Sequence, residues 1–265
     1  MSWRRAFLLS LVLWLASAGG ARAEELETFC VDRPGLGTPD CTIDSGHAVV
    51  EFGLADWTHS SDDGVRDDSL VLGEFLLRYG LGDHLEAQLG WDGLGFDREH
   101  SAGATIHETG AGDLRFALRY GFGDPDALSA AVMPFVTLPI GDDPVGAGDW
   151  TAGLILPVEY ALPHGIELDF TGEIDAAADA AGSGHHSAYS ATIGLGLPVG
   201  EQLAAAVELQ ANFDEDPLDK SDQLLGGLSL AWTPSNAFQL DAGAVVGLGH
   251  HDPGVELYAG IARRF

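Results

Sequence analysis

The sequence predicts an all-β protein, a transmembrane antiparallel up-and-down β-barrel of about 12 strands that follows a cleaved signal peptide. Three observations support this prediction. Apolar and polar residues alternate with a period of two from Gly46 to the C-terminus, an export signal precedes them, and every second connection between the predicted strands is short. A formal charge of -29 with a mean hydropathy of +0.09 also requires acidic and apolar residues to occupy separate surfaces.

The N-terminus has the three parts of a secretory signal peptide. Arg4 and Arg5 form the basic start, residues 6–16 form an apolar run, and Ala21-Arg22-Ala23 is a typical cleavage site. The apolar run is too short to cross a membrane, and no later stretch reaches the roughly 18–20 apolar residues that a spanning helix needs. We therefore expect residues 1–23 to be removed near Ala23 and the mature chain to be placed in the outer membrane of a Gram-negative bacterium.

Residues 24–45 form a predicted periplasmic segment with two cysteines. Cys30 and Cys41 flank a turn rich in proline and glycine, and in an oxidising compartment we expect them to form a disulfide. Closing a loop of this length contributes roughly 3 kcal/mol. Two cysteines are too few for a disulfide scaffold or a multi-cysteine zinc site.

The motif Asp32-Arg33-Pro34 lies inside this cysteine loop. We hypothesise that the loop enters or crosses the barrel lumen, where Arg33 meets inward acids such as Glu51 or Glu86. The alternative is a surface loop whose disulfide serves only to resist proteases.

The barrel is predicted to occupy residues 46–265. In the segment 166–175, Ile166, Leu168, Phe170 and Ile174 fall on one side of a strand and the acids fall on the other. Short turns are predicted at 82–83, 123–126, 163–165, 200–201 and 234–236, between longer loops. The predicted strands are residues 47–57, 69–81, 84–94, 113–122, 128–139, 150–162, 165–175, 187–199, 202–213, 222–233, 237–248 and 254–265.

The alternation also assigns a face to each charged residue. If the apolar side faces lipid, no charge lies in the middle of a strand on that side, where it would cost about 2–4 kcal/mol. Pro134 and Pro157 fall inside strands, so we expect bulges or local breaks there. The charged residues predicted to line the lumen are Glu51, Glu74, Arg78, Glu86, Arg115, Arg119, Glu159, Glu167, Asp169, Glu173, Glu208, Asp241 and Glu256.

The last strand ends in Phe265, with Leu257, Ala259 and Ile261 in register with it. It looks like the C-terminal signal by which the barrel-assembly machinery recognises its clients. Arg263 departs from that pattern, and we expect its side chain to reach the periplasmic interface.

Several motifs together resemble a family of outer-membrane transporters named for the meta-pathway of phenol degradation. The resemblance implies a barrel in the outer membrane, uptake of aromatic or other hydrophobic compounds, and no catalytic residues. The matching motifs cover most of the mature chain: Asp32-Arg33-Pro34, Ser45-Gly46, residues 50–53 (VEFG), residues 77–86 (LRYGLGDHLE), residues 110–114 (GAGDL), residues 138–141 (LPIG), residues 239–241 (QLD) and residues 263–265 (RRF).

The predicted function is passive uptake of a small molecule through the lumen. Arg78, Arg115 and Arg119 would form a basic stripe opposite Glu167, Asp169 and Glu173, creating a transverse field that favours polar permeants. Alternatively, these charges pair with one another and close the lumen, which leaves a structural or adhesion barrel without transport. We expect lipid, lipopolysaccharide and the assembly machinery as partners, and no cofactor. Nucleic acid is excluded because the acidic chain would repel it.

An enzyme is the remaining alternative. An outer-membrane phospholipase needs a serine and a histidine on the lipid face, for which His59-x-Ser61 and His185-x-Ser187 are candidates, but both are predicted to lie in loops without a third, orienting residue. The loops also hold possible metal ligands, and for these we predict solvated surface and no metal site. The possible ligands are His185-His186, His250-His251-Asp252, Asp62-Asp63 and Asp214-Glu215-Asp216.

Overall fold

A computed structural model describes residues 29–62, 64–181, 184–249 and 254–265. The predicted signal peptide and His250-His251-Asp252 lie outside these residues. The described part contains a 3-10 turn, η1 (Pro163–Gly165), and fifteen labelled strands. The strands are β1 (Ala48–Asp62), β2 (Val65–Leu72), β3 (Glu74–Gly82), β4 (Leu85–Trp91), β5 (Leu94–Ser101), β6 (Ala104–Ala111), β7 (Leu114–Asp124), β8 (Leu128–Leu138), β9 (Thr151–Leu162), β10 (Ile166–Ala178), β11 (His185–Pro198), β12 (Leu203–Asp214), β13 (Ser221–Ser235), β14 (Phe238–Gly247) and β15 (Val255–Arg264).

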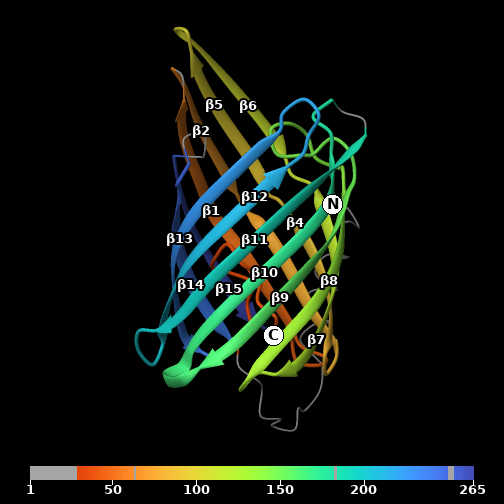
Figure 1. Ribbon diagram of the computed structural model, residues 1–265, viewed down its shortest axis with the longest axis vertical. Helices are drawn as coiled ribbons and strands as arrows, with labels where there is room; N and C mark the ends of the chain where they lie inside the picture. Colours follow the sequence, from red (N-terminus) through yellow and green to blue (C-terminus); the bar gives the residue numbers. More distant parts are fainter. Residues whose placement is uncertain (1–28, 63, 182–183, 250–253) are drawn as a thin grey trace, which may run out of the picture.

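The strands form one closed antiparallel barrel (Figure 1). Each wall strand pairs with its neighbour in sequence, and β15 pairs with β1 to close the ring. β2 and β3, β4 and β5, and β6 and β7 are the two halves of single wall strands, interrupted near Gly73, Gly93 and Gly112. Counting each such pair once gives twelve wall strands, so the predicted fold class is confirmed.

Two predicted loops were wrong. Residues 58–68 and 95–112 form mainly the hairpins β1–β2 and β5–β6, which extend beyond the rest of the wall at the end with the longer connections (Figure 1). The reason is physical: strands above the lipid need no apolar outer face, so the period-two signal fades although pairing continues. The short turns lie at the other end, as predicted.

The predicted face assignment agrees with the exposure of the side chains. On β7, Phe116, Leu118 and Tyr120 are 42%, 49% and 50% exposed, whereas the intervening Arg119 is 0% exposed. This arrangement is the reverse of a soluble protein, in which large apolar side chains are the buried ones. It fits a wall whose outer face is covered by lipid.

The two strand prolines interrupt hydrogen bonding without shifting the register. Pro134 has no partner in the β7–β8 ladder, and Pro157 has none in the β8–β9 ladder, yet pairing resumes in the same register on both sides. Proline lacks the N–H that a ladder requires. The prolines therefore produce local breaks in place of bulges.

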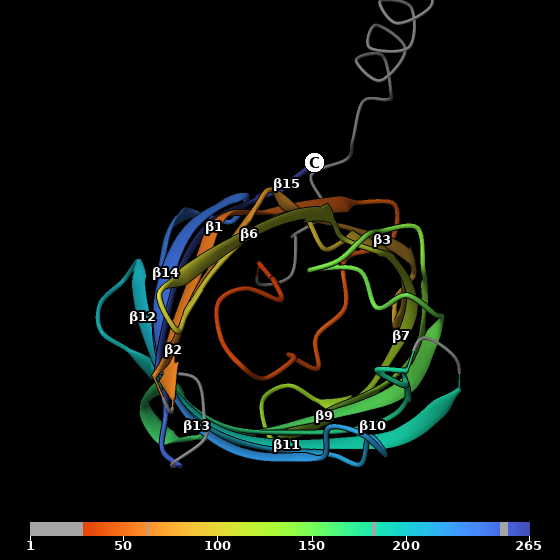
Figure 2. The same cartoon turned by 90° about the horizontal axis from the view of Figure 1, so that it is seen from above.

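Residues 29–47, here called the lumen segment, lie inside the ring of strands when the barrel is viewed from above (Figure 2). The segment joins the wall at β1, where the Ala48 N–H donates to the Phe265 carbonyl oxygen and the Phe265 N–H donates to that of Ala48. Among the described residues, no helix has the length and apolar character needed to cross a membrane. The interior of the barrel is therefore occupied in part by the chain's own N-terminal region.

Candidate functional site in the barrel lumen

The lumen segment is bent into a compact loop by a disulfide between Cys30 and Cys41. Phe29, Cys30 and Ile43 pack with Val49 of β1 and Ala262 of β15 in a small buried apolar cluster. This cluster fixes the base of the segment, and the wall acids and arginines hold the remainder.

Asp32 is the central contact between the segment and the wall. Its Oδ1 lies 2.8 Å from Arg78 Nη1 and 2.9 Å from Arg119 Nη1, and Arg119 Nη2 donates to Oδ2 over 2.9 Å. Arg78 on β3 and Arg119 on β7 are both completely buried. One carboxylate of the segment therefore neutralises part of two wall cations that would be costly to bury alone.

Glu86 on β4 supplies the second partner of Arg78. Arg78 Nε and Nη2 donate to the two Glu86 carboxylate oxygens, each over 2.9 Å, in a bidentate pair. The same guanidinium donates to the Cys41 carbonyl oxygen at 3.1 Å, and so does Arg119, also at 3.1 Å. The arginines therefore bind the backbone of the segment as well as its carboxylate.

Two further wall acids bind the segment through its backbone N–H groups. Glu51 accepts hydrogen bonds from the N–H groups of Asp32 and Arg33, and Glu208 accepts from those of Leu36 and Gly37. Sequence reasoning placed both glutamates inside but missed the neutral groups that assist them, because polarity on the inward face does not reveal a partner. Those groups are Thr171, Gln210 and Gln239.

The side chain of Arg33 meets inward acids, as hypothesised, but these are Asp241 and Glu74 and not the two named examples, Glu51 and Glu86. Its Nε lies 3.3 Å from Asp241 Oδ1 on β14, its Nη1 lies 3.7 Å from Glu74 Oε2 on β3, and its guanidinium stands over the Tyr258 ring. Glu51 is already bound by the backbone of the segment, and Glu86 is bound by Arg78. Arg33 therefore contacts one acid on each side of β1, Asp241 on β14 and Glu74 on β3.

Glycines in the wall make room for the segment. A Cβ at Gly80 of β3 would overlap the carbonyl groups of Ile43 and Asp44. Within the segment, Gly35 has φ of +131°, a conformation that other residues rarely adopt, and it turns the chain past Glu208. Glycines in both the segment and the wall therefore allow the two to approach closely.

The predicted basic stripe is divided, and of its three arginines only Arg115 lies close enough to one of the predicted opposing acids, Glu173, for the charges to interact. Arg78 and Arg119 form ion pairs with Asp32 of the segment. The Cζ of Arg115 lies 3.8 Å from the centre of the Phe135 ring. The apolar residues Ala117, Met133, Phe135 and Ile155 form a buried cluster on this part of β7–β9. Of the opposed charges expected from the sequence, Arg115 and Glu173 remain, whereas Arg78 and Arg119 pair with Asp32 of the segment.

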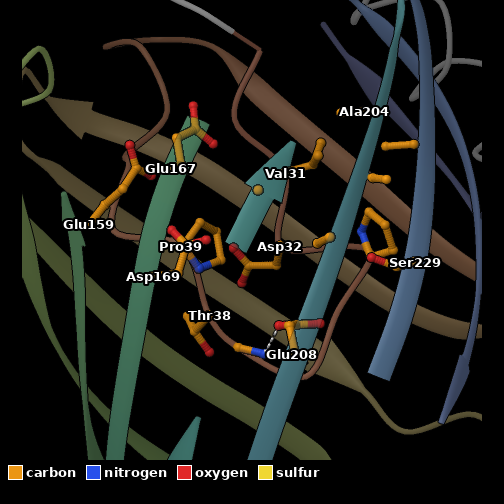
Figure 3. Close-up of a pocket in the computed structure, with 16 residues that line it drawn as sticks. Val31, Asp32, Thr38, Pro39, Glu159, Glu167, Asp169, Ala204, Glu208 and Ser229 are labelled. Carbon is orange, nitrogen blue, oxygen red and sulfur yellow. Dashed lines mark hydrogen bonds between the residues drawn. The ribbon is translucent and has the colours of Figure 1, made fainter. Parts of the chain in front are cut away.

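A cavity of about 200 Å³ lies between the lumen segment and the wall strands β9–β13 (Figure 3). Glu159, Glu167 and Asp169, here called the acidic wall, project into it from β9 and β10, opposite Thr38 and Pro39 of the segment. Glu208 and Ser229 line it from β12 and β13. The lining contains no lysine or arginine among the described residues.

The remaining predicted lumen acids lie nearer the end with the longer connections. Glu173 lines a second cavity of about 450 Å³ with Asp175 and Asp214, and Glu256 lies against Asp56 on the neighbouring β1. Asp113, which we did not predict, is 1% exposed and accepts hydrogen bonds from the N–H groups of Gly141 and Ala147. It holds the β8–β9 connection, and its motif in residues 110–114 was the signal available in the sequence.

The structure revises one reason for setting the phospholipase aside. His59 lies in β1, where its Nδ1 is 2.9 Å from Asp68 Oδ1 on β2, so an orienting carboxylate is present. The sequence did not reveal it because Asp68 comes close only through strand pairing. His185 instead bonds the Trp150 carbonyl oxygen. In the described part of the chain, no hydrogen bond joins Ser61 or Ser187 to these histidines.

At the rim, the β12–β13 connection is organised by Asp216. Its carboxylate accepts hydrogen bonds from the N–H groups of Ala180, Leu218 and Asp219. These bonds lower the pKa of Asp216, the contact with Ala180 contributing most. Asp63 of the other predicted acidic loop lies outside the described residues.

Comparison with models of known protein families identifies the family of this chain. Residues 31–265 match the model of the family described as "Putative MetA-pathway of phenol degradation". The chain belongs to this family. The match begins inside the lumen segment, so the phenol-degradation family model covers both the segment and the wall that binds it. Among curated proteins, none matches the chain.

Solved structures show the same fold at low sequence identity. An outer membrane channel from Pseudomonas putida F1 is 16% identical, with a TM-score of 0.71 over 88% of this chain and 100% of that one. The NanC porin is 9% identical, with a TM-score of 0.51 over 82% and 98%. The translocator domain of the autotransporter NalP from Neisseria meningitidis is 15% identical, with a TM-score of 0.50 over 83% and 89%.

Proposed function

We propose that this phenol-degradation family member is a passive outer-membrane channel whose permeant passes between the lumen segment and the acidic wall. The observation that carries the proposal is the cavity of about 200 Å³ at that boundary. Pockets that hold drug-sized ligands measure roughly 300–1,000 Å³, so the permeant is a small molecule.

The charge of the lining sets the class of permeant. Glu159, Glu167 and Asp169 face the cavity without a lysine or arginine in its lining, while the nearby wall arginines are bound to Asp32 and Glu86. Rings of acidic side chains favour cations over anions. We therefore propose small cationic or neutral permeants, including neutral phenols in keeping with the family description, and little passage of aromatic carboxylates.

Single-channel recording in planar bilayers tests this function. We expect the refolded protein to form small, cation-selective channels. Neutral phenols should reduce the ionic current when added at millimolar concentration, whereas benzoate should have a much weaker effect. Current that favours anions, or equal block by phenol and benzoate, would contradict the proposed permeant class.

A closed structural barrel is the second candidate. It is favoured by the complete burial of Arg78 and Arg119 and by the number of wall strands that bind the segment. The two candidates are separated by liposome swelling with a small neutral solute. Folded protein that gives no swelling and no conductance supports the closed barrel.

A further inference from the structure

Three side chains from two different connections meet at the rim of the barrel. His186 is the second residue of β11, Asp179 follows β10, and Asp216 lies in the β12–β13 connection. His186 Nδ1 is 2.9 Å from Asp179 Oδ1 and 3.5 Å from Asp216 Oδ2. Two separate connections therefore present carboxylates to one nitrogen of a single imidazole.

The imidazole is almost completely enclosed. The His186 side chain is 6% exposed, as is that of Asp216, and Asp179 is 18% exposed. A third carboxylate, Asp214, places Oδ1 2.8 Å from Nε2, yet Nε2 makes no hydrogen bond of normal geometry to any described residue. Even a protonated ring offsets only one of three nearby negative charges, so the cluster lacks positive charge.

The donor atoms lie close enough together to share one metal ion. The ligand atoms of Asp179, His186 and Asp216 all lie within 4.8 Å of one another. A tetrahedral zinc ion with bonds of roughly 2.0–2.2 Å needs donor separations of about 3.3–3.6 Å. The separations of 2.9 and 3.5 Å from Nδ1 need only small adjustment to meet this geometry.

We propose that Asp179, His186 and Asp216 bind a divalent transition-metal ion, with Zn²⁺ the best match. An imidazole nitrogen with carboxylate oxygens suits zinc better than calcium or magnesium, which prefer oxygen ligands alone. The ion takes the place of the Nδ1 proton, which passes to solvent. Asp214 Oδ1 lies 2.8 Å from Nε2, on the far side of the ring, where a carboxylate commonly lies behind a metal-bound histidine.

The ion would join the β10–β11 and β12–β13 connections at the mouth of the lumen. These connections already touch, because the Ala180 N–H donates to Asp216 and the Glu215 N–H donates to the Ser187 carbonyl oxygen. Asp214 also lines the cavity of about 450 Å³. Metal binding would therefore stiffen one side of the entrance, whether or not the barrel conducts.

The test is zinc titration of the folded full-length protein in detergent by isothermal calorimetry, without a histidine tag. His250 and His251 are replaced by alanine in every sample, so that they contribute no binding. His59→Asn is the matched control, because His59 lies 2.9 Å from a single carboxylate on the same rim. The test variants are His186→Asn and Asp179→Asn, and folding is checked by heat-dependent migration on gels.

We expect one zinc ion per chain in the background protein and in His59→Asn. Either test variant should bind zinc roughly 100-fold more weakly or not at all. Should His186→Asn fail to fold, Asp179→Asn carries the test alone. The proposal is overturned if the background protein binds no zinc, or if a folded test variant binds it as tightly as the control.

Discussion

Charged side chains have different surroundings on the two sides of the lumen. On the side of β1, β3, β4 and β7, wall charges bind the lumen segment directly, and Arg78 and Arg119 are buried against Asp32. On the side of β9 and β10, Glu159, Glu167 and Asp169 face a cavity whose lining has no lysine or arginine. One side is a structural anchor, and the other is available to a permeant.

A charged residue that points into the lumen can anchor the segment or face the cavity, so its inward position alone does not define its role. Glu86 and Glu167 are both inward glutamates on barrel strands, yet Glu86 is held in a bidentate pair with Arg78, whereas Glu167 faces the cavity. Position relative to the lumen segment separates them. Substitutions on each side of the lumen test this difference.

The largest effect is expected from Asp32→Ala. The substitution leaves two buried guanidinium groups without their shared carboxylate, and breaking a buried ion pair costs roughly 3–5 kcal/mol. We expect a loss of that order in the free energy of unfolding in urea, together with a larger or noisier single-channel current as the segment loosens. Asp126→Ala, in an exposed turn, is the control and should change neither.

A smaller effect on the same side is expected from Gly80→Ala. The added methyl group would overlap the backbone of Ile43 and Asp44, and overpacking of this kind costs about 1–3 kcal/mol. Gly82→Ala, two residues along β3 with open space around its Cβ position, should be close to neutral. Equal unfolding free energies for the two variants would argue against a fixed segment.

The sequence predicted the wall well and the contacts between segment and wall only in part. Alternation places Glu51, Arg78 and Arg119 inside because the strand period is exact and lipid tolerates no charge. It does not assign Arg33 to Asp241, because that contact joins residues 208 positions apart in the chain and depends on how the segment turns at Gly35. The lumen segment is not a strand, so no alternation of polar and apolar residues predicts which wall residues it contacts.

The rim was the least predictable region. Residues 95–112 carry few apolar side chains and were predicted as a loop, although they form most of a paired hairpin. In the same way, Asp68 and His59 meet only because β1 and β2 continue beyond the predicted strands. Above the lipid, the strands stay paired without a continuous apolar outer face, so the hydrophobicity of the sequence does not reveal them.

On the cavity side, Glu159→Gln with Glu167→Gln should alter selectivity more than stability. Both side chains face the cavity, so removing two negative charges is expected to lower the cation-to-anion permeability ratio several-fold while unfolding in urea stays nearly unchanged. The readout is the reversal potential across a salt gradient. The control is Glu201→Gln, in an exposed turn, which should leave the ratio as it was.

We propose that the permeant passes beside the lumen segment, along β9–β13, and cysteine modification tests this path most directly. Ala206 lines the cavity, whereas Ala117 is buried in the apolar cluster of β7–β9, and the two native cysteines are joined in a disulfide. We expect a small cationic methanethiosulfonate reagent to block current through Ala206→Cys channels and to leave Ala117→Cys channels conducting. Block of Ala117→Cys without block of Ala206→Cys would show that the permeant takes a different path.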